Sequence, residues 1–101
     1  MRLSVEEQHI IRRTVAETFG PAARVYVFGS RVDDSRRGGD IDLYVETELP
    51  FAASFATRTQ LSLVLEDRLG EQKIDILVRH AGMKGESPPI YRIAQETGIQ
   101  L

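Results

Sequence analysis

A helix-like segment between two strand-like runs places the strongest constraint on the fold of this 101-residue chain. Residues 40–45 and 73–78 are rich in β-branched and apolar side chains, which is typical of strands. Residues 52–69 between them carry an apolar stripe with helical spacing: Leu61, Leu65 and Leu69. Two strands joined through a helix pair in parallel by a right-handed crossover. We therefore expect a β-α-β unit.

The flanking segments add one strand and two helices. Residues 24–28 are β-branched and aromatic, and a polar loop joins them to the strand at 40–45, so these two strands can pair antiparallel. Ser4 and Glu7 have the spacing of a capping box that opens a helix through about residue 19. Residues 90–97 form a short terminal helix. The expected fold is α/β (α+β), a small mixed sheet in the order α-β-β-α-β-α, with helices on one face and the other face partly open.

Length and composition limit the possible classes of protein. We expect a single domain over 1–101, with a motif core at 24–78 and a C-terminal tail at 79–101. The absence of cysteine excludes disulfides, thiolate zinc sites and cysteine nucleophiles. No signal-peptide run or stretch of ~20 apolar residues occurs, so we expect a cytoplasmic protein that does not enter membranes. The net charge of -2 disfavours nucleic-acid binding by the isolated chain.

A phosphate-binding turn is predicted at Gly29-Ser30, directly after the first strand. Such a turn exposes backbone N–H groups and a hydroxyl, and Ser30 with Asp33 matches the start of a short helix whose N-terminus would favour an anion. Arg31, and with it Arg36 and Arg37, adds cations that could contact a triphosphate. The alternative is a solvated loop whose glycine serves only the turn.

A pair of carboxylates follows at Asp40 and Asp42. Residues two apart on a strand point to the same face, while the intervening apolar residues face the core. Carboxylate oxygens on a rigid strand suit Mg²⁺, and the cation would relieve their mutual repulsion. The alternatives are an exposed face with two solvated acids, or an aspartate that caps the start of the strand.

Asp75 is the third candidate. It interrupts the apolar run 74–78, which we expect to be mostly buried, and an aspartate there is costly unless it is paired, hydrogen-bonded or bound to metal. The predicted topology places its strand beside the strand of Asp40 and Asp42, so the three acids would converge next to the phosphate-binding turn. The competing explanation is a salt bridge from Lys73, which shares the parity of Asp75.

Other catalytic motifs are missing from the sequence. The loop after Gly29 lacks the Gly-Lys-Ser/Thr ending of a P-loop, no G-x-G-x-x-G follows a strand, and the two aspartates do not continue as an EF-hand. His9 and His80, which are the only histidines, do not suggest a zinc site or a Ser-His-Asp triad.

Three segments together resemble the signature of the DNA polymerase beta-type nucleotidyltransferase superfamily: Phe28-Gly-Ser30, Gly39-Asp-Ile-Asp-Leu43 and Ile74-Asp-Ile76. The chain length is similar to that of minimal nucleotidyltransferases, which lack an acceptor-binding domain. The resemblance implies that Gly29 and Ser30 hold the β/γ-phosphates. It also implies that Asp40 and Asp42 ligate two Mg²⁺ ions, and that Asp75 ligates one of them and takes the proton of the acceptor. Arg31, Arg36 and Arg37 match no position of the signature.

The resemblance further implies a Mg²⁺-dependent enzyme that moves a nucleoside monophosphate, AMP from ATP, onto a hydroxyl. Minimal nucleotidyltransferases are commonly paired with a helical HEPN protein as antitoxin and toxin, and adenylylation of the toxin is the implied activity. The alternatives are a non-catalytic nucleotide-binding module that neutralises a partner by binding, or a transferase acting on a small molecule or an RNA end.

We expect the docking surface for such a partner on the open face of the sheet. Tyr26, Phe28 and Tyr44 share or border the parity of the aspartates and would line that face. The tail would add Ile90, Tyr91 and Ile93, unless it packs back on the domain.

Overall fold

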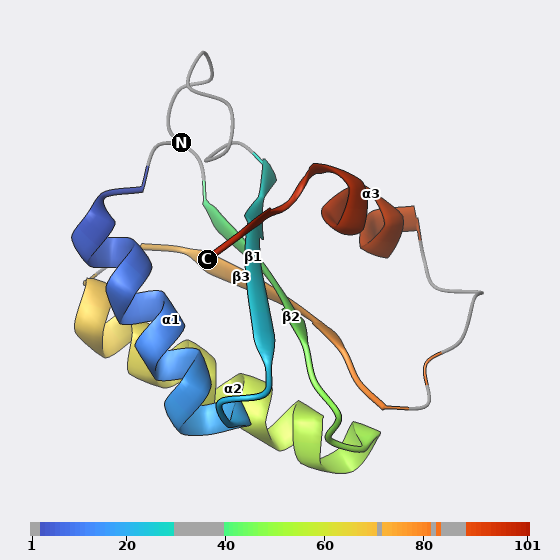
Figure 1. Ribbon diagram of the computed structural model, residues 1–101. Helices are drawn as coiled ribbons and strands as arrows, with labels where there is room; N and C mark the ends of the chain where they lie inside the picture. Colours follow the sequence, from blue (N-terminus) through green and yellow to red (C-terminus); the bar gives the residue numbers. More distant parts are fainter. Residues whose placement is uncertain (1–2, 30–39, 71, 82, 84–88) are drawn as a thin grey trace.

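A computed structural model describes residues 3–29, 40–70, 72–81, 83 and 89–101 (Figure 1). Its elements follow the predicted order, with one short strand added at the C-terminal end: α1 (Val5–Phe19), β1 (Arg24–Phe28), β2 (Ile41–Glu46), α2 (Phe51–Leu69), β3 (Ile74–Arg79), α3 (Pro89–Thr97) and β4 (Ile99–Gln100). Among the described helices, none has both the length and the apolar character needed to cross a bilayer.

The strands form one mixed sheet in the order β3-β2-β1-β4. β1 pairs antiparallel with β2 and with β4, whereas β2 and β3 are parallel, which confirms the predicted β-α-β crossover. β3 is consequently an outer strand of the sheet. β4 exists because the chain returns after α3 along β1, where Leu101 N donates to Val25 O at 2.9 Å.

The first helix begins where its sequence predicts. The Ser4 hydroxyl accepts from Glu7 N at 3.0 Å, and Ser4 N donates to the Glu7 carboxylate at 3.0 Å, so both halves of the capping box are present. α2 begins after Pro50, whose fixed φ suits the start of a helix.

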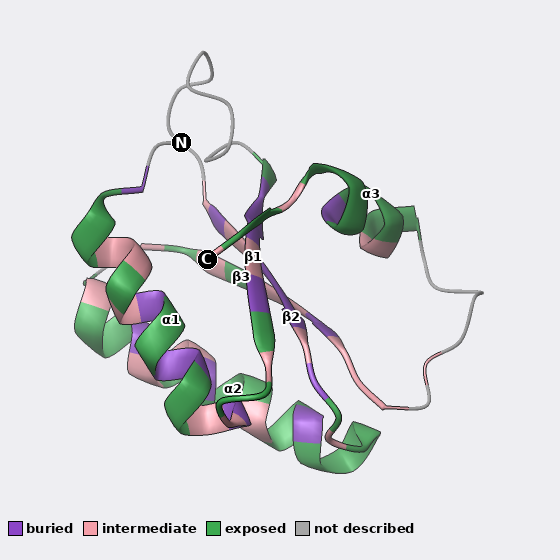
Figure 2. Cartoon of the chain, in the orientation of Figure 1, coloured by how far each residue is buried: buried purple, intermediate pink, exposed green. Residues whose placement is uncertain are grey.

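The main core lies between the sheet and the two long helices (Figure 2). Apolar side chains of α1 and α2 pack on the face of β1 and β2 that the alternating pattern assigns to the core; the most buried are Ile11, Val15, Val27, Ile41, Leu43, Val45, Leu61 and Leu65. Arg68 of α2 ties the helices together, because its Nη1 lies 2.8 Å from both Thr14 Oγ1 and Glu17 Oε2. Thr14 is buried in this contact.

The opposite face is partly covered by α3, so the expectation of helices on one face holds for α1 and α2 only. Ala94 of α3 packs with Phe28 and the fully buried Tyr44, and Gln95 Nε2 donates to the Tyr44 hydroxyl at 3.1 Å. Tyr91 meets Tyr44 edge-on at 6.4 Å between ring centroids. The expected docking surface of Tyr26, Phe28 and Tyr44 is therefore wrong. The tail packs back on the domain instead.

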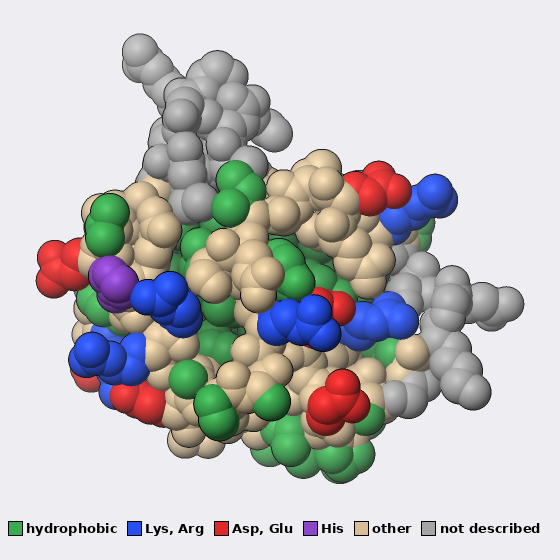
Figure 3. Space-filling view, viewed as in Figure 1, with side chains coloured by type: hydrophobic (Ala, Val, Ile, Leu, Met, Phe, Trp, Pro, Cys, Tyr) green, Lys and Arg blue, Asp and Glu red, His purple; other side chains and the backbone are tan. Residues whose placement is uncertain are grey.

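Exposed apolar side chains lie elsewhere. Figure 3 shows apolar side chains gathered over the first turns of α2, where Phe51 and Phe55 are 63% and 55% exposed. Ile90 and Ile93 of α3 are exposed as well, since only the side of α3 that carries Ala94 and Tyr91 faces the sheet.

Candidate active site

The predicted carboxylates come from adjacent positions on two neighbouring strands. Asp42 of β2 and Asp75 of β3 are Cα partners in the parallel ladder, so their side chains leave the same face of the sheet. Asp40 lies immediately before β2. The sheet thus brings the three aspartates to one region at the start of β2 and β3, as the sequence predicted.

The burial that the sequence predicted for Asp75 is wrong. Its side chain is exposed, and most of the apolar residues around it in β3 are only partly buried. β3 is an edge strand with a partner on one side only, so an apolar run there does not force burial. Asp75 consequently carries no burial penalty that a metal would have to offset.

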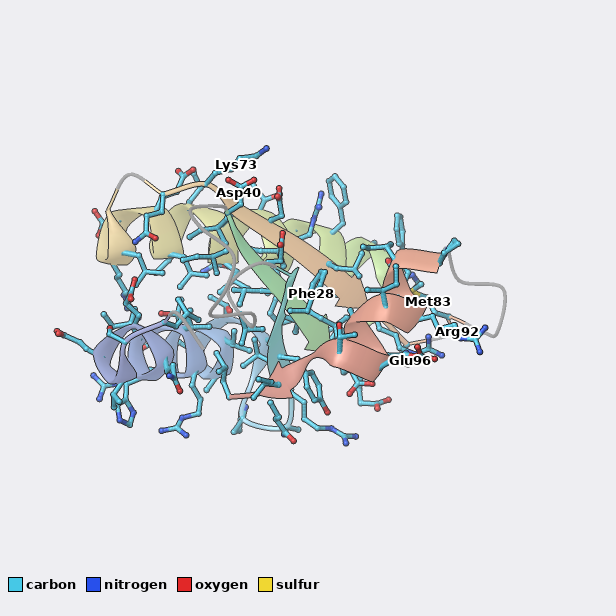
Figure 4. All side chains as sticks on the ribbon, turned by 90° about the horizontal axis from the view of Figure 1, so that it is seen from above. Phe28, Asp40, Lys73, Met83, Arg92 and Glu96 are labelled. Atoms are coloured by element: carbon cyan, nitrogen blue, oxygen red, sulfur yellow. The ribbon has the colours of Figure 1, made fainter. Side chains whose placement is uncertain are left out.

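Lys73 pairs with Asp40 and not with Asp75. Its Nζ lies 3.5 Å from Asp40 Oδ2, and Figure 4 shows the two side chains together at the end of the sheet. Both side chains keep substantial exposure, 72% and 41%, so the pair contributes little stability, about 0–1 kcal/mol. Its effect is electrostatic: one cation stands beside the carboxylates.

Asp42 is the carboxylate most affected by its surroundings. Partial burial raises its pKa, and the negative charges of Asp75 and Asp40 raise it further, whereas Lys73 lowers it. The three aspartates therefore interact through their charges, and Lys73 offsets this repulsion only in part. A bound cation would remove it.

Gly29, which directly follows β1, leaves space for the carboxylate of Asp42. Phe28 and Asp42 are register partners, and Gly29 follows with φ +74°, a left-handed conformation that glycine adopts without strain. A Cβ at position 29 would collide with the Asp42 carboxylate and lie 3.1 Å from its Cγ. Position 29 therefore requires glycine for two reasons, its backbone conformation and the space taken by Asp42.

The remaining predicted phosphate-binding residues, Ser30 and Arg31, lie outside the described residues, and so do Arg36 and Arg37. Gly29, which is described, places the end of β1 directly beside Asp42. A phosphate-binding role for this turn stays a prediction.

A pocket of ≈ 690 Å³ contains Asp42, Asp75 and Gly29 on one side. Its other wall is α2, which contributes Arg58, Ser62 and Glu66 at successive turns. Sequence reasoning missed these residues. Their four-residue spacing marks a polar stripe beside the leucine stripe of α2, but only the parallel crossover shows that this stripe borders the aspartates.

The carboxylate oxygens of Asp40, Asp42 and Asp75 are suitable ligands for a hard divalent cation. Carboxylate oxygens are the ligands that Mg²⁺ prefers, and the repulsion that raises the pKa of Asp42 indicates negative charge that is not fully compensated. Within the described ranges, no three acidic or histidine side chains are yet gathered closely enough to hold one ion. Rotation of exposed side chains such as Asp75 would therefore accompany binding.

Comparison with known proteins yields no matching family model and no matching curated protein. Among solved structures, the chain is similar to a chain in the crystal structure of a mutant of the toxin-antitoxin MntA-HpeT. The TM-score is 0.66 at 20% sequence identity, with 92% of this chain and 70% of that chain covered. At 20% identity this likeness shows the fold alone. The chain therefore shares its fold with that neighbour over most of its length.

Proposed function

We propose that this protein is a Mg²⁺-dependent nucleotidyltransferase that moves AMP from ATP onto a hydroxyl of a partner protein, and that it acts as the antitoxin of a toxin–antitoxin pair. The observation that carries the proposal is the register pairing of Asp42 with Asp75, beside Gly29 and Asp40, on a nucleotidyltransferase-like fold. In the similar toxin-antitoxin structure, two aspartates two positions apart are replaced by glutamate, and Asp40 and Asp42 have the same spacing.

The reaction would be an in-line displacement at the α-phosphorus of ATP. The acceptor oxygen forms a bond to this phosphorus, the bond to the β-phosphate oxygen breaks, and pyrophosphate leaves. Asp75, which is exposed and lines the pocket, would take the proton of the acceptor hydroxyl. Asp40, Asp42 and Asp75 would hold two Mg²⁺ ions, which neutralise charge on the attacking and leaving oxygens when bound.

The acceptor is proposed to be a helical HEPN-type protein encoded by the adjacent gene. The similar structure is described as a toxin-antitoxin, which supports a protein partner for this chain as well. The exposure of Asp75 supports it too, because a hydroxyl on a protein surface can reach this carboxylate at the pocket.

Label transfer tests the activity. The protein is incubated with Mg²⁺, the adjacent gene product and ATP labelled at either the α- or the γ-phosphate. Transfer of AMP requires that only the α label enters protein, and mass spectrometry then identifies the modified residue. Asp42→Asn should abolish labelling, whereas Asp67→Asn, which removes an exposed carboxylate of α2, should not. Labelling that survives Asp42→Asn would show that this aspartate is not a ligand.

The second candidate is a module that neutralises its partner by binding alone. It is favoured by the exposed apolar residues of α2 and α3, which an enzyme acting on a small molecule would not need. Thermal unfolding with and without MgATP separates the two. A nucleotide at 100 times its dissociation constant adds ~2.7 kcal/mol of stability. A partner complex without any shift by nucleoside triphosphates would support the module.

A further inference from the structure

The pocket that contains Asp42 and Asp75 continues as a groove along the free edge of β3. Two adjoining hollows of ≈ 690 and ≈ 270 Å³ share Arg58, Ile76 and Leu77. The larger hollow reaches Asp42 and Asp75, and the smaller one extends to the other end of β3. Together they form one trough, the β3 groove, which has α2 on one side, α3 on the other and the aspartates at one end.

The walls of the β3 groove are apolar and exposed. Leu63 of α2 is 62% exposed, and Ile90 and Ile93 of α3 are 42% and 50% exposed. Phe51 and Phe55 continue the same wall toward the smaller hollow. Side chains of this size gathered along one edge, from two separate helices, mark an interaction surface and not a solvated one.

The backbone of the β3 edge is partly covered by side chains. Ile41 N donates to Lys73 O and Thr47 N donates to Arg79 O, both at 3.0 Å. The backbone N–H and C=O groups of the odd-numbered residues of β3 therefore face β2, and those of the even-numbered residues face the free edge. Arg58 Nη1 donates to the outward carbonyl of Ile76 at 3.5 Å. The Tyr91 hydroxyl donates to the backbone carbonyl of Val78 at 3.1 Å.

These two contacts disfavour the addition of a strand. A strand at this edge would compete with Arg58 and Tyr91 for the carbonyls of Ile76 and Val78. Arg58 is also held from the other side, with its guanidinium 5.3 Å from the Phe55 ring centroid. The groove therefore favours an occupant that inserts side chains and satisfies its own backbone, which is a helix.

The charged residues of the groove indicate which side chains that helix should carry. Arg58 is the only lysine or arginine among its described lining residues, whereas tracking a phosphate backbone requires several. The end near the active site carries Asp42, Asp75 and Glu66. An apolar helix with a basic residue at this end complements that distribution, and a nucleic acid does not.

We propose that the β3 groove receives an amphipathic helix of the partner protein, with apolar residues at i, i+4 and i+7 between Leu63 and Ile93 and a basic residue facing Glu66. The helix would run toward the aspartates and so place an adjacent hydroxyl at Asp75. The site of docking rests on the exposed residues of the groove, and the delivery of a hydroxyl rests on the function proposed above.

The test uses the full chain and the adjacent gene product. Leu63→Gln and Ile93→Gln alter opposite walls of the groove at exposed positions, and Val5→Gln alters an exposed apolar residue of α1 as a control. We expect each groove variant to weaken the complex about ten-fold by calorimetry, and the control to bind as the wild type does. All three variants should unfold at the melting temperature of the wild type, because each replaces an exposed side chain.

Three outcomes would overturn the inference. The first is that both groove variants bind the partner as tightly as the wild type. The second is that light scattering shows a homodimer that the variants disrupt, which makes a second copy the occupant. The third is that a labelled 20-nucleotide RNA binds the wild type and not the variants. Failure of the proposed activity is separate: the wild type would then bind the partner through the groove without transferring label from α-labelled ATP.

Discussion

The carboxylate of Asp42 occupies the space that a Cβ at position 29 would need, so Gly29 and Asp42 form one structural unit across β1 and β2. Gly29 and Asp42 lie far apart along the chain, and the antiparallel pairing of β1 with β2 brings them together.

Gly29→Ala should therefore reduce activity more than its effect on stability explains. Any L-residue at φ +74° costs about 1–2 kcal/mol, and the added methyl group would also push the Asp42 carboxylate out of place. Gly70→Ala is the matched control, because Gly70 has φ +84° and a methyl group there would meet nothing within 4 Å. The measurements are the unfolding free energy and the rate of label transfer. Equal losses of activity in the two variants would contradict the role of Gly29.

Asp42→Asn should stabilise the metal-free protein at neutral pH. Folding raises the pKa of Asp42 above its unfolded value of ~3.9, so ionised Asp42 disfavours the folded state at pH 7. This penalty is absent below pH ~3.9, where the carboxyl is protonated in both states, and it appears as the pH rises through the folded pKa. The melting temperature of Asp42→Asn should thus exceed that of the wild type at pH 7 and converge with it near pH ~3.5.

Two controls accompany this measurement. Asp67→Asn makes the same change in net charge on the exposed surface of α2 and should leave the melting temperature nearly unchanged. Mg²⁺ should stabilise the wild type and not Asp42→Asn. A melting temperature of Asp42→Asn below that of the wild type at pH 7 would show that the carboxylate is favourably placed without metal.

Lys73→Met should strengthen binding of Mg²⁺. The ammonium group stands 3.5 Å from Asp40 Oδ2, where it compensates the carboxylates and repels a divalent cation. Because the pair is exposed, we expect a gain of a few-fold in affinity that shrinks at high salt, and little change in stability. Calorimetric titration with Mg²⁺ at two ionic strengths provides the measurement, with Lys73→Arg as the charge-preserving control. Weaker binding by Lys73→Met would mean that Lys73 orients Asp40 for the metal.

Local patterns in the sequence were sufficient to predict most of the fold. The capping box at Ser4 and the leucine stripe of α2 depend on contacts within one element, and the alternation in β2 assigns its two faces without knowledge of its neighbours. The parallel pairing of β2 with β3 then follows from the helix between them, because strands joined through a crossover helix pair in parallel.

Long-range features could not be predicted in the same way. An apolar run such as residues 74–78 looks alike in a central and an edge strand, so the exposure of Asp75 depends on the strand order. The partner of Lys73 and the role of Arg58 likewise depend on register and on which edge stays free. α3 is short enough that its position over Tyr44 is determined by packing and not by its own pattern.

Two leucines of α2, one buried and one exposed, offer a test that separates folding from binding. Leu65 is fully buried in the main core, and Leu63 is 62% exposed on the wall of the β3 groove. Leu65→Ala should cost about 2–5 kcal/mol of unfolding free energy, because it removes buried methyl groups and leaves a cavity. Leu63→Ala should stay within about 0.5 kcal/mol of the wild type. Denaturant unfolding of both variants measures this difference, and a large loss in Leu63→Ala would mean that its side chain serves the fold and that the groove is part of the core.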